Sequence, residues 1–253
     1  MFVDALKGAL RRLAPSVFER LRLQTKRRRT LRRILEDRDP VVRDGPFAGM
    51  RFVYLGTSSG ELPMVVGCFE AELHEHLEAL LALDPRVVVN IGCAEGYYAV
   101  GLARRLPRAT IVAIDTDPAA LRLCAAVASL NGVSDRVRLE AHADLGARDL
   151  RGALIVCDCE GCEYTLLDPA RVPGLAHSNL IIELHHTADP AQPEKLLAPF
   201  RATHDVAIVP FTPTCAARER ILAALALEED RALVRAERTM PDQAWAVLKS
   251  RAL

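Results

Sequence analysis

No apolar run of eighteen residues or more occurs in the 253-residue chain, so the sequence predicts no membrane-spanning helix. The first residues, Met1 to Lys7, lack the long apolar segment of a signal peptide, and we therefore expect a cytoplasmic protein. No internal repeat and no low-complexity linker interrupts the chain. Because half of the residues are hydrophobic, a large core can be buried, and disorder along the whole length is excluded.

The cysteines do not form the even set that a disulfide framework needs. There are seven of them, and without an export signal they indicate reduced thiols. Cys157, Cys159 and Cys162 cluster, and Cys93 is expected near the same edge of the predicted sheet. The spacing C-x-C-x-x-C differs from the paired C-x-x-C of familiar zinc sites, so we do not assign a soft-metal site.

Positive charge is concentrated at the start of a chain whose formal net charge is zero. Residues 1–35 hold eleven lysines and arginines against two acids, Asp4 and Glu19. Apolar residues recur there at helical spacing, which predicts one or two amphipathic helices with a break near Pro15. We expect residues 1–38 to form a basic arm that packs on the rest of the protein or on a second subunit. Contact with nucleic acid or with an anionic membrane stays an alternative.

Residues 39–84 differ in pattern from the basic arm, and they predict an N-terminal segment that covers the main domain, here called the cover. Short strands are expected at 41–43 and 50–55, and a Gly/Ser-rich turn at 56–60. A helix should follow at 70–83, where leucines recur at helical spacing.

The most informative segment is Val87–Ala99, VVVNIGCAEGYYA, followed by Asp115 nineteen residues after Gly96. A short apolar run that ends in glycine is typical of a buried parallel strand, and Gly92 and Gly96 allow a tight turn into a helix. A second apolar run then ends at Asp115. A carboxylate at that strand tip accepts hydrogen bonds from the hydroxyls of a ribose lying across the first turn. The pattern predicts a site for a nucleoside-containing cofactor.

Glycine spacing distinguishes between such cofactors. Dinucleotide sites use G-x-G-x-x-G to bring a helix N-terminus against a pyrophosphate, whereas Gly92-x-x-x-Gly96 lacks the third glycine. The segment instead resembles motif I and the acidic loop of class I S-adenosylmethionine-dependent methyltransferases, and the chain is similar to their FkbM-type branch. Asn90 and Ala94 depart from the acid and the middle glycine usual in that superfamily. The likeness runs from about residue 45 to 249 and includes GCFEAEL at 67–73, DCEGCE at 158–163 and IIELH at 181–185.

Beyond residue 85, apolar runs and helical segments alternate as in a doubly wound parallel sheet. We predict an α/β protein whose residues 85–253 form one seven-stranded Rossmann-like methyltransferase sheet, with helical and short-strand additions at the N-terminus. In the superfamily the last strand is typically inserted antiparallel. Strands are expected at 87–91, 111–114, 136–141, 153–157, 180–184, 204–210 and 244–248, and helices at 97–105, 118–130 and 216–238.

The resemblance implies which residues hold the cofactor. The turn Gly92–Gly96 would cradle the methionine part, and the start of the next helix offers backbone amides to its carboxylate. Asp115 is the expected ribose ligand, while Asp117 caps the following helix. Asp144 resembles the residue that contacts the adenine amino group, and Glu70 the glutamate near the amino end of the cofactor. The complete expected set is Glu70, Asn90, Gly92, Cys93, Gly96, Asp115, Thr116 and Asp144.

Acids and imidazoles follow the runs expected to become the fourth and fifth strands. Both tips belong to the carboxyl edge of the sheet, where the acceptor must lie in line with the sulfonium methyl group. An imidazole beside a carboxylate there can deprotonate a hydroxyl acceptor at neutral pH. From the group Asp158, Glu160, Glu163, Glu183, His185 and His186, the predicted catalytic residues are Asp158, Glu160, Glu183 and His185. Oxygen ligands of this kind also suit Mg²⁺, and a magnesium ion stays an alternative.

The sequence favours methylation of a hydroxyl on a small molecule or sugar by in-line transfer from S-adenosylmethionine. Methyltransferases of amino groups on nucleic-acid bases commonly carry Asn/Asp-Pro-Pro-aromatic after the fourth strand, and this chain has DCEG at 158–161. One alternative is a methyltransferase of RNA or protein that uses the basic arm. The other is a non-catalytic cofactor-binding module at a membrane surface. No motif in the sequence identifies the acceptor or the oligomeric state.

Overall fold

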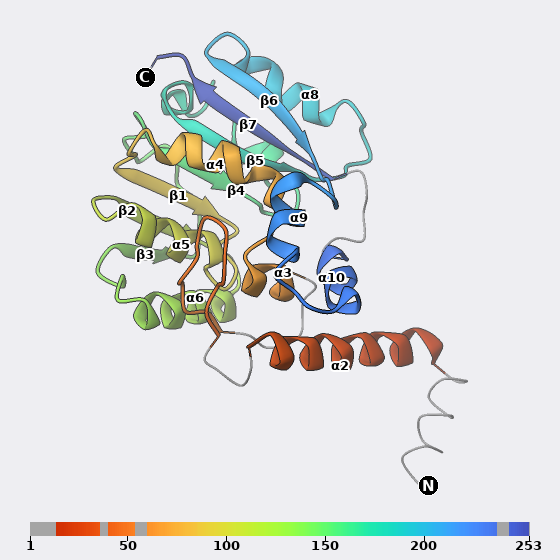
Figure 1. Cartoon of the computed structure of the whole chain (residues 1–253). Helices are drawn as coiled ribbons and strands as arrows, with labels where there is room; N and C mark the ends of the chain where they lie inside the picture. Colours follow the sequence, from red (N-terminus) through yellow and green to blue (C-terminus); the bar gives the residue numbers. More distant parts are fainter. Residues whose placement is uncertain (1–13, 36–39, 54–59, 237–242, 253) are drawn as a thin grey trace, which may run out of the picture.

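The computed structural model describes residues 14–35, 40–53, 60–236 and 243–252, and a seven-stranded sheet forms its centre (Figure 1). The strand order is β3-β2-β1-β4-β5-β7-β6. Neighbours from β3 to β5 pair in parallel, whereas β7 runs antiparallel to both β5 and β6. The predicted fold class is therefore confirmed. The strands are β1 (Val87–Ile91), β2 (Thr110–Ile114), β3 (Val137–Glu140), β4 (Leu154–Cys157), β5 (Asn179–Leu184), β6 (His204–Pro210) and β7 (Ala244–Ser250).

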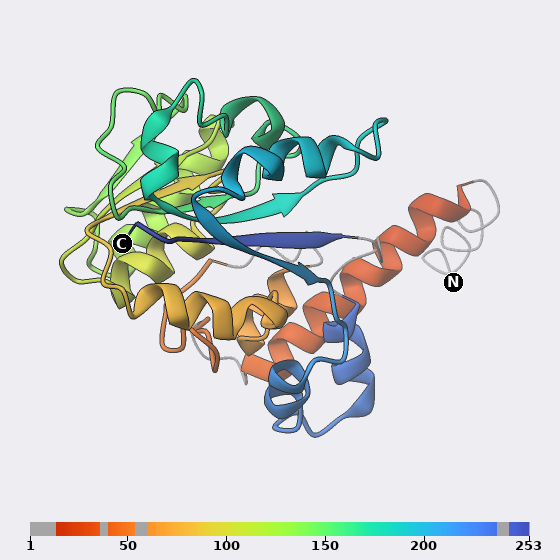
Figure 2. The ribbon, with the colours of Figure 1, turned by 90° about the horizontal axis from the view of Figure 1, so that it is seen from above.

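Helices cover the sheet on both faces (Figure 2). Successive side chains of a strand point to opposite faces, so Val88 and Val89 of β1 belong to two different core clusters. Helices α4, α5 and α6 contribute to the cluster of Val88, and α7 and α8 to that of Val89. The helices are α2 (Pro15–Leu35), α3 (Glu61–Val66), α4 (His74–Leu81), α5 (Tyr97–Arg105), α6 (Pro118–Leu130), α7 (Glu163–Leu166), α8 (Gln192–Leu197), α9 (Ala216–Leu222) and α10 (Glu228–Arg235).

The carboxyl edge of the sheet has its crevice at β1, which pairs with β2 on one side and with β4 on the other. The chain winds outward from β1 to β3 and then crosses back to β4, so the winding reverses between β1 and β4. Ligands of open α/β sheets bind outside the strand ends at such a point.

The second helix of the winding unit begins as the sequence predicts. Asp117 is its N-cap, and its carboxylate accepts a hydrogen bond from the Ala119 amide at 2.8 Å. Pro118 follows in the first turn, where its missing N–H costs nothing. These local signals place the start of α6, and with it the loop that carries Asp115.

The last predicted helix, 216–238, is instead two helices, and this prediction is wrong. The chain is extended at Leu227, and α10 starts there with three acids in its first turn, Glu228, Glu229 and Asp230. Acids are favourable at a helix N-terminus, so a second start is built into the segment. Short helices α3, α7 and α8 also occur where the sequence indicated none.

The cover has less regular structure than expected. Of the strands predicted at 41–43 and 50–55, the described part shows an isolated bridge between Val41 and Arg51. Residues 54–59, including most of the predicted turn, lie outside the described residues. The predicted helix at 70–83 is found as a 3₁₀ turn, Ala71–Leu73, followed by α4.

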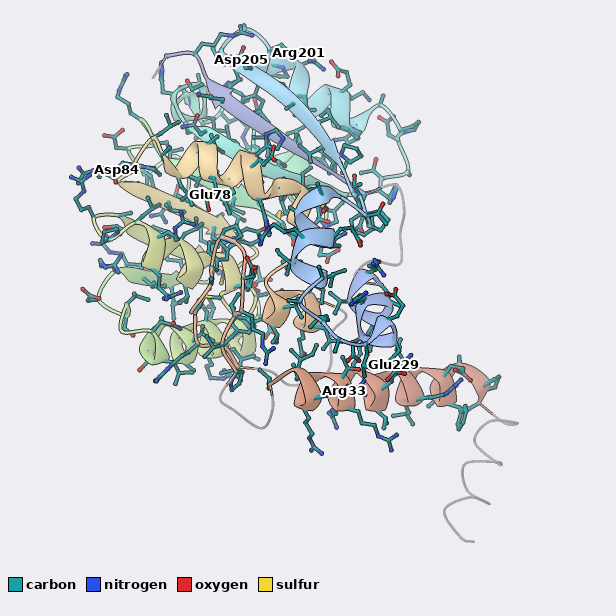
Figure 3. The ribbon with its side chains drawn as sticks, in the orientation of Figure 1. Arg33, Glu78, Asp84, Arg201, Asp205 and Glu229 are labelled. Carbon is teal, nitrogen blue, oxygen red and sulfur yellow. A yellow bond between two sulfur atoms is a disulfide. The ribbon has the colours of Figure 1, made fainter. Side chains whose placement is uncertain are left out.

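The described part of the basic arm is one helix, α2, which begins at Pro15. Its C-terminal half packs on α3 and α10 in a third core cluster that includes Ile34. Thr30 donates a hydrogen bond to Asp230 at 2.8 Å, and Arg33 pairs with Glu229 at 2.9 Å (Figure 3). The N-terminal end of α2 projects past α10 (Figures 1 and 2). The part of the arm expected before residue 14 lies outside the described residues. None of the described helices is long and apolar enough to cross a membrane.

Candidate active site

A cavity of about 640 Å³ opens at the carboxyl edge, where the winding reverses. The loops that follow β1, β2, β3 and β4 all contribute to its wall. Three of the expected cofactor residues line it, namely Gly92, Asp115 and Thr116. Much of the remaining wall is apolar, formed by Ile91, Ala94, Ile114, Ala141, Ala143 and Leu166.

The first wall of the cavity depends on a glycine. Gly92 has φ +75°, and a Cβ there would lie 1.5 Å from the Asp158 carbonyl oxygen. Only glycine lets the turns after β1 and β4 approach so closely. The amide nitrogens of Gly92 and Cys93 both donate to the Ile114 carbonyl at 2.9 Å, which ties this turn to the end of β2.

Asp115 joins the first two loops. One carboxylate oxygen accepts from the Ala94 amide at 2.9 Å, and the other accepts from the Asp117 amide at 2.9 Å. A carboxylate offers about four lone-pair sites, so Asp115, which lines the cavity, retains capacity to accept further hydrogen bonds. Asp115 therefore has a structural task, bracing the loops, in addition to any contact with a ligand.

Five of the expected cofactor residues do not contribute to the cavity wall. The Cys93 side chain is buried in the core, next to Cys124. Gly96 begins α5, where a Cβ would lie 2.8 Å from the Cys124 sulfur. Both residues thus serve helix packing in the described structure. The other three are Glu70, Asn90 and Asp144.

These three side chains have partners of their own. Glu70 is buried and accepts a hydrogen bond from the Tyr98 hydroxyl. Asn90 is buried in β1 and donates to the Val156 carbonyl at 3.4 Å. Asp144 is exposed and accepts from the Ala147 amide at 3.3 Å, while the preceding residue pair His142 and Ala143 lines the cavity. Sequence reasoning had selected the acid of this loop and missed His142.

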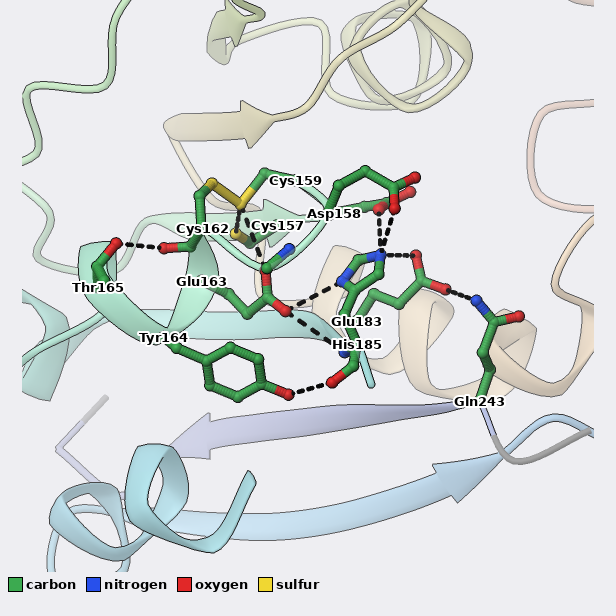
Figure 4. Close-up of polar contacts among 12 residues, drawn as sticks. Cys157, Asp158, Cys159, Cys162, Glu163, Tyr164, Thr165, Glu183, His185 and Gln243 are labelled. Carbon is green, nitrogen blue, oxygen red and sulfur yellow. Dashed lines mark hydrogen bonds and ion pairs between the residues drawn. A yellow bond between two sulfur atoms is a disulfide. The ribbon is translucent and has the colours of Figure 1, made fainter. Parts of the chain in front are cut away.

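The predicted catalytic residues come together around His185 (Figure 4). Its Nε2 lies 3.4 Å from an oxygen of Asp158, 3.6 Å from Glu160 and 3.7 Å from Glu183. Asp158 and Glu160 also line the cavity, so the cluster and the cavity share a wall. The carboxylate of Glu183 accepts a hydrogen bond from the Gln243 amide at 3.3 Å.

Glu163 completes the cluster, and the predicted catalytic set did not include it. Its side chain is fully buried, and Oε1 lies 3.0 Å from Nδ1 of His185. The left-handed conformations of Glu160 (φ +55°) and Gly161 (φ +104°) turn the chain back, so that α7 starts beneath the imidazole. Its signal in the sequence was the last acid of DCEGCE, which also suits a helix start.

Burial and crowding of charge shift the titration of this cluster. Burial, together with the charge of Glu183, raises the pKa of Asp158 to about 8. For His185, burial alone would lower the pKa. The hydrogen bond that the ring donates to Glu163, together with the charges of Glu183, Glu163 and Asp158, outweighs burial and raises the pKa to about 9. Near neutral pH the cluster therefore holds a His185 imidazolium bound to the ionised Glu163, while Asp158 is largely in its protonated form.

The same donors could hold a metal ion. One ligand atom each from Asp158, Glu183 and His185 lies within 4.8 Å of the others. With Nδ1 bound to Glu163, the ring presents Nε2 to the acids, and a carboxylate behind a histidine ligand is the usual arrangement around bound metals. The donor chemistry of these three residues thus fits a divalent cation.

The expectation of reduced thiols is wrong for one pair. Cys159 and Cys162 form a disulfide, and both line the cavity. The other described cysteines, which form no disulfide, are Cys68, Cys93, Cys124, Cys157 and Cys215. Cys93 lies next to Cys124 and does not join the cysteines that follow β4.

No protein-family model matches this sequence, and no curated protein matches it. Among solved structures, the chain is similar to an rRNA methylase from Streptococcus thermophilus, with 14% identity, a TM-score of 0.48, and coverage of 71% of this chain and 96% of the other. It is similar to the O-methyltransferase TomG from Streptomyces achromogenes, with 14% identity, a TM-score of 0.47, and coverage of 75% and 86%. It is also similar to an S-adenosylmethionine-dependent methyltransferase from Geobacter sulfurreducens, with 22% identity, a TM-score of 0.43, and coverage of 70% and 89%. Because unrelated functions share folds, the function has to be argued from the site.

Proposed function

We propose that the chain is an S-adenosylmethionine-dependent methyltransferase that transfers the methyl group to a hydroxyl of a small molecule or sugar. One observation carries the proposal. Gly92 and Asp115 line the same cavity as Asp158 and Glu160, and those two acids lie 3.4 Å and 3.6 Å from Nε2 of His185. A ribose-type ligand site and a proton-accepting cluster therefore adjoin.

The cavity wall fits the parts of the cofactor. The carboxylate of Asp115 retains acceptor capacity for ribose hydroxyls, and the apolar residues Ala143 and Leu166 suit a purine ring. Gly92 and Ala94 line the part of the wall that would lie beside the methionine part. When bound, S-adenosylmethionine supplies an electrophilic methyl group on a sulfonium sulfur.

The acid cluster would take the proton of the acceptor hydroxyl. Asp158 faces the cavity, and His185 lies directly behind it at 3.4 Å. Proton acceptance by this pair is supported by Glu163, since a buried carboxylate on Nδ1 orients the ring and stabilises the imidazolium. With pKa values of about 8 for Asp158 and about 9 for His185, both groups are largely protonated at pH 7, so turnover is expected to rise with pH until they are deprotonated.

Mg²⁺ is a finer form of the same proposal. Asp158, Glu183 and His185 would hold the ion, which would lower the pKa of the acceptor hydroxyl as a Lewis acid. Calorimetry with MgCl₂ tests this step on the wild-type protein and on Glu183→Gln. Heat of binding in the wild type alone supports a metal site, and no heat in either protein excludes magnesium binding without the cofactor.

Calorimetry with S-adenosylhomocysteine and with NAD tests the cofactor assignment. We expect S-adenosylhomocysteine to bind and NAD not to bind. Binding of NAD with none of S-adenosylhomocysteine would contradict the proposal. Asp158→Asn and His185→Gln should retain affinity for S-adenosylhomocysteine and lower methyl transfer from radiolabelled S-adenosylmethionine to a panel of small hydroxyl compounds.

Methylation of RNA is a second candidate, and the projecting basic helix α2 supports it. Lys26, Arg29 and Arg32 are exposed on that helix. If RNA is the acceptor, binding of a structured RNA should weaken steeply with salt and be lost in the triple alanine variant of these residues. Unchanged binding in that variant would contradict this candidate.

A further inference from the structure

The disulfide between Cys159 and Cys162 lies in the wall of the cavity. Both residues are half-buried and line a space that opens to solvent, so a small thiol compound can reach the sulfur atoms. A C-x-x-C pair is the spacing that redox-active cysteines commonly use. Accessibility distinguishes this pair from the deeply buried cysteines of the core.

A third sulfur lies beneath the pair. Cys157 is buried at the end of β4, and its Sγ lies 3.6 Å from Sγ of Cys159. Burial raises the pKa of the Cys157 thiol well above its ordinary value, so the thiol stays protonated and is a poor nucleophile. Cys157 therefore leaves the pairing of Cys159 with Cys162 undisturbed.

The pair is connected to the acid cluster through Glu163. Oε2 of Glu163 lies 3.5 Å from Sγ of Cys159 and accepts a hydrogen bond from the Gly161 amide at 3.0 Å. The other oxygen, Oε1, binds His185. The disulfide thus closes the turn, from residue 159 to 162, that delivers both Asp158 and Glu163 to their places.

We propose that Cys159 and Cys162 form a reversible redox switch of this site. A thiolate of a dithiol reductant attacks one sulfur, the Cys159–Cys162 bond breaks, and a mixed disulfide forms. The second thiol of the reductant then displaces the protein sulfur, and the reductant leaves as its own disulfide. Two electrons and two protons end on the two cysteines.

Reduction changes the site in two ways. The turn loses its covalent closure and becomes free to move away from the cavity. Sγ of Cys159 also gains a proton and becomes a donor 3.5 Å from Glu163, where it competes with His185 for the charge of that carboxylate. We expect affinity for S-adenosylhomocysteine to fall about fivefold or more on reduction, a consequence that rests on the proposed function.

The test equilibrates the protein in mixtures of reduced and oxidised dithiothreitol. Alkylation and mass spectrometry report the state of the pair, the ring resonance of His185 reports the cluster, and calorimetry reports affinity for S-adenosylhomocysteine. The double variant Cys159→Ser/Cys162→Ser should resemble the reduced wild type, and its His185 resonance and affinity should not change with the redox mixture. Cys215→Ser, which changes a free cysteine at the start of α9, should respond as the wild type does.

The outcomes separate this proposal from the proposed function. A reversible change of the pair that moves the His185 resonance supports the switch, whatever the cofactor. A pair that never changes state, or a change that leaves the His185 resonance where it was, overturns the switch. Equal affinity for S-adenosylhomocysteine in both states also overturns it, whereas no binding in either state contradicts the methyltransferase assignment alone.

Discussion

Replacing Glu163 by glutamine is expected to lower the pKa of His185. The Glu163 side chain is fully buried, and one oxygen lies 3.0 Å from Nδ1 of the ring while the other accepts from the Gly161 amide. Glutamine keeps the size of the side chain and an acceptor oxygen, and it removes the charge. Burial of the ring, which by itself lowers the pKa, is unchanged by the substitution.

The expected size of the effect follows from the contact. A carboxylate within hydrogen-bonding distance raises the pKa of a partner by about 1–3 pH units. Since the other acids around His185 remain, we expect Glu163→Gln to lower its pKa from about 9 by roughly 1–2 pH units. This corresponds to about 1.4–2.7 kcal/mol of lost preference for the imidazolium.

The assay is a pH titration of the histidine ring signals by NMR, with His185→Gln to assign the resonance. Glu160→Gln is the matched control, because Glu160 is 90% exposed and lies 3.6 Å from Nε2. Solvent screens such a pair, so the control should move the midpoint by less than about 0.5 pH units. A wild-type midpoint near the ordinary 6.5, or equal midpoints in wild type and Glu163→Gln, would refute the reasoning.

The same titration has a consequence for stability. The folded pKa of His185 lies above its ordinary value, so the stabilising contribution of the imidazolium is complete below about pH 6.5 and is lost as the pH rises through 9. Between these values the free energy of unfolding should fall less steeply in His185→Gln than in the wild type. The free energy of unfolding is measured by urea denaturation at several pH values. An equal pH dependence in the two proteins would contradict this assignment.

Three further predictions concern the loops at the cavity, the start of α5 and the docking of α2. Asp115→Ala should weaken binding of S-adenosylhomocysteine about tenfold or more by calorimetry, because the ribose contacts and the hydrogen bond from the Ala94 amide are lost together. The control Asp117→Ala, which removes only a helix cap, should cost about 1 kcal/mol of stability and leave the affinity unchanged. Gly96→Ala should cost more than about 2 kcal/mol in urea denaturation, since φ is +91° and the new Cβ meets Cys124, whereas Gly132→Ala, with φ +66° and open space, should cost about 1 kcal/mol. Thr30→Val should cost about 1 kcal/mol, because the hydrogen bond to the buried Asp230 is lost while the Arg33 contact remains, and an unchanged melting curve would argue against docking of α2.

The winding unit around the cavity was predictable because its signals are local. Helix bounds at 97–105 and 118–130 and the strand at 87–91 agree with the structure, since glycine, the Asp117 cap and Pro118 act on their immediate neighbours. The segment 216–238 was predicted less well. Its helix-favouring residues run on without a glycine or proline break, so the three acids at 228–230 are a weak local signal for a second start, and packing on α2 and α3 positions α10.

The candidate site was also predictable only in part. The approach of Asp158 to His185 follows from topology, because two neighbouring parallel strands end at one edge. Topology does not determine the direction in which a side chain just beyond a strand points. Cys93 faces the core rather than the cavity, and Glu163 lies under His185 rather than on the surface.

The sequence alone thus determined the α/β sheet, the position of its crevice and the types of residue at its edge, since each depends on patterns within a few neighbours along the chain. Only the tertiary structure decided that Glu163 holds His185 and that Cys159 pairs with Cys162. The first contact joins residues 22 apart through the end of β5, a distance that a short-range pattern does not record. The second spans three residues and depends on the left-handed backbone of Glu160 and Gly161, which residue types alone do not specify.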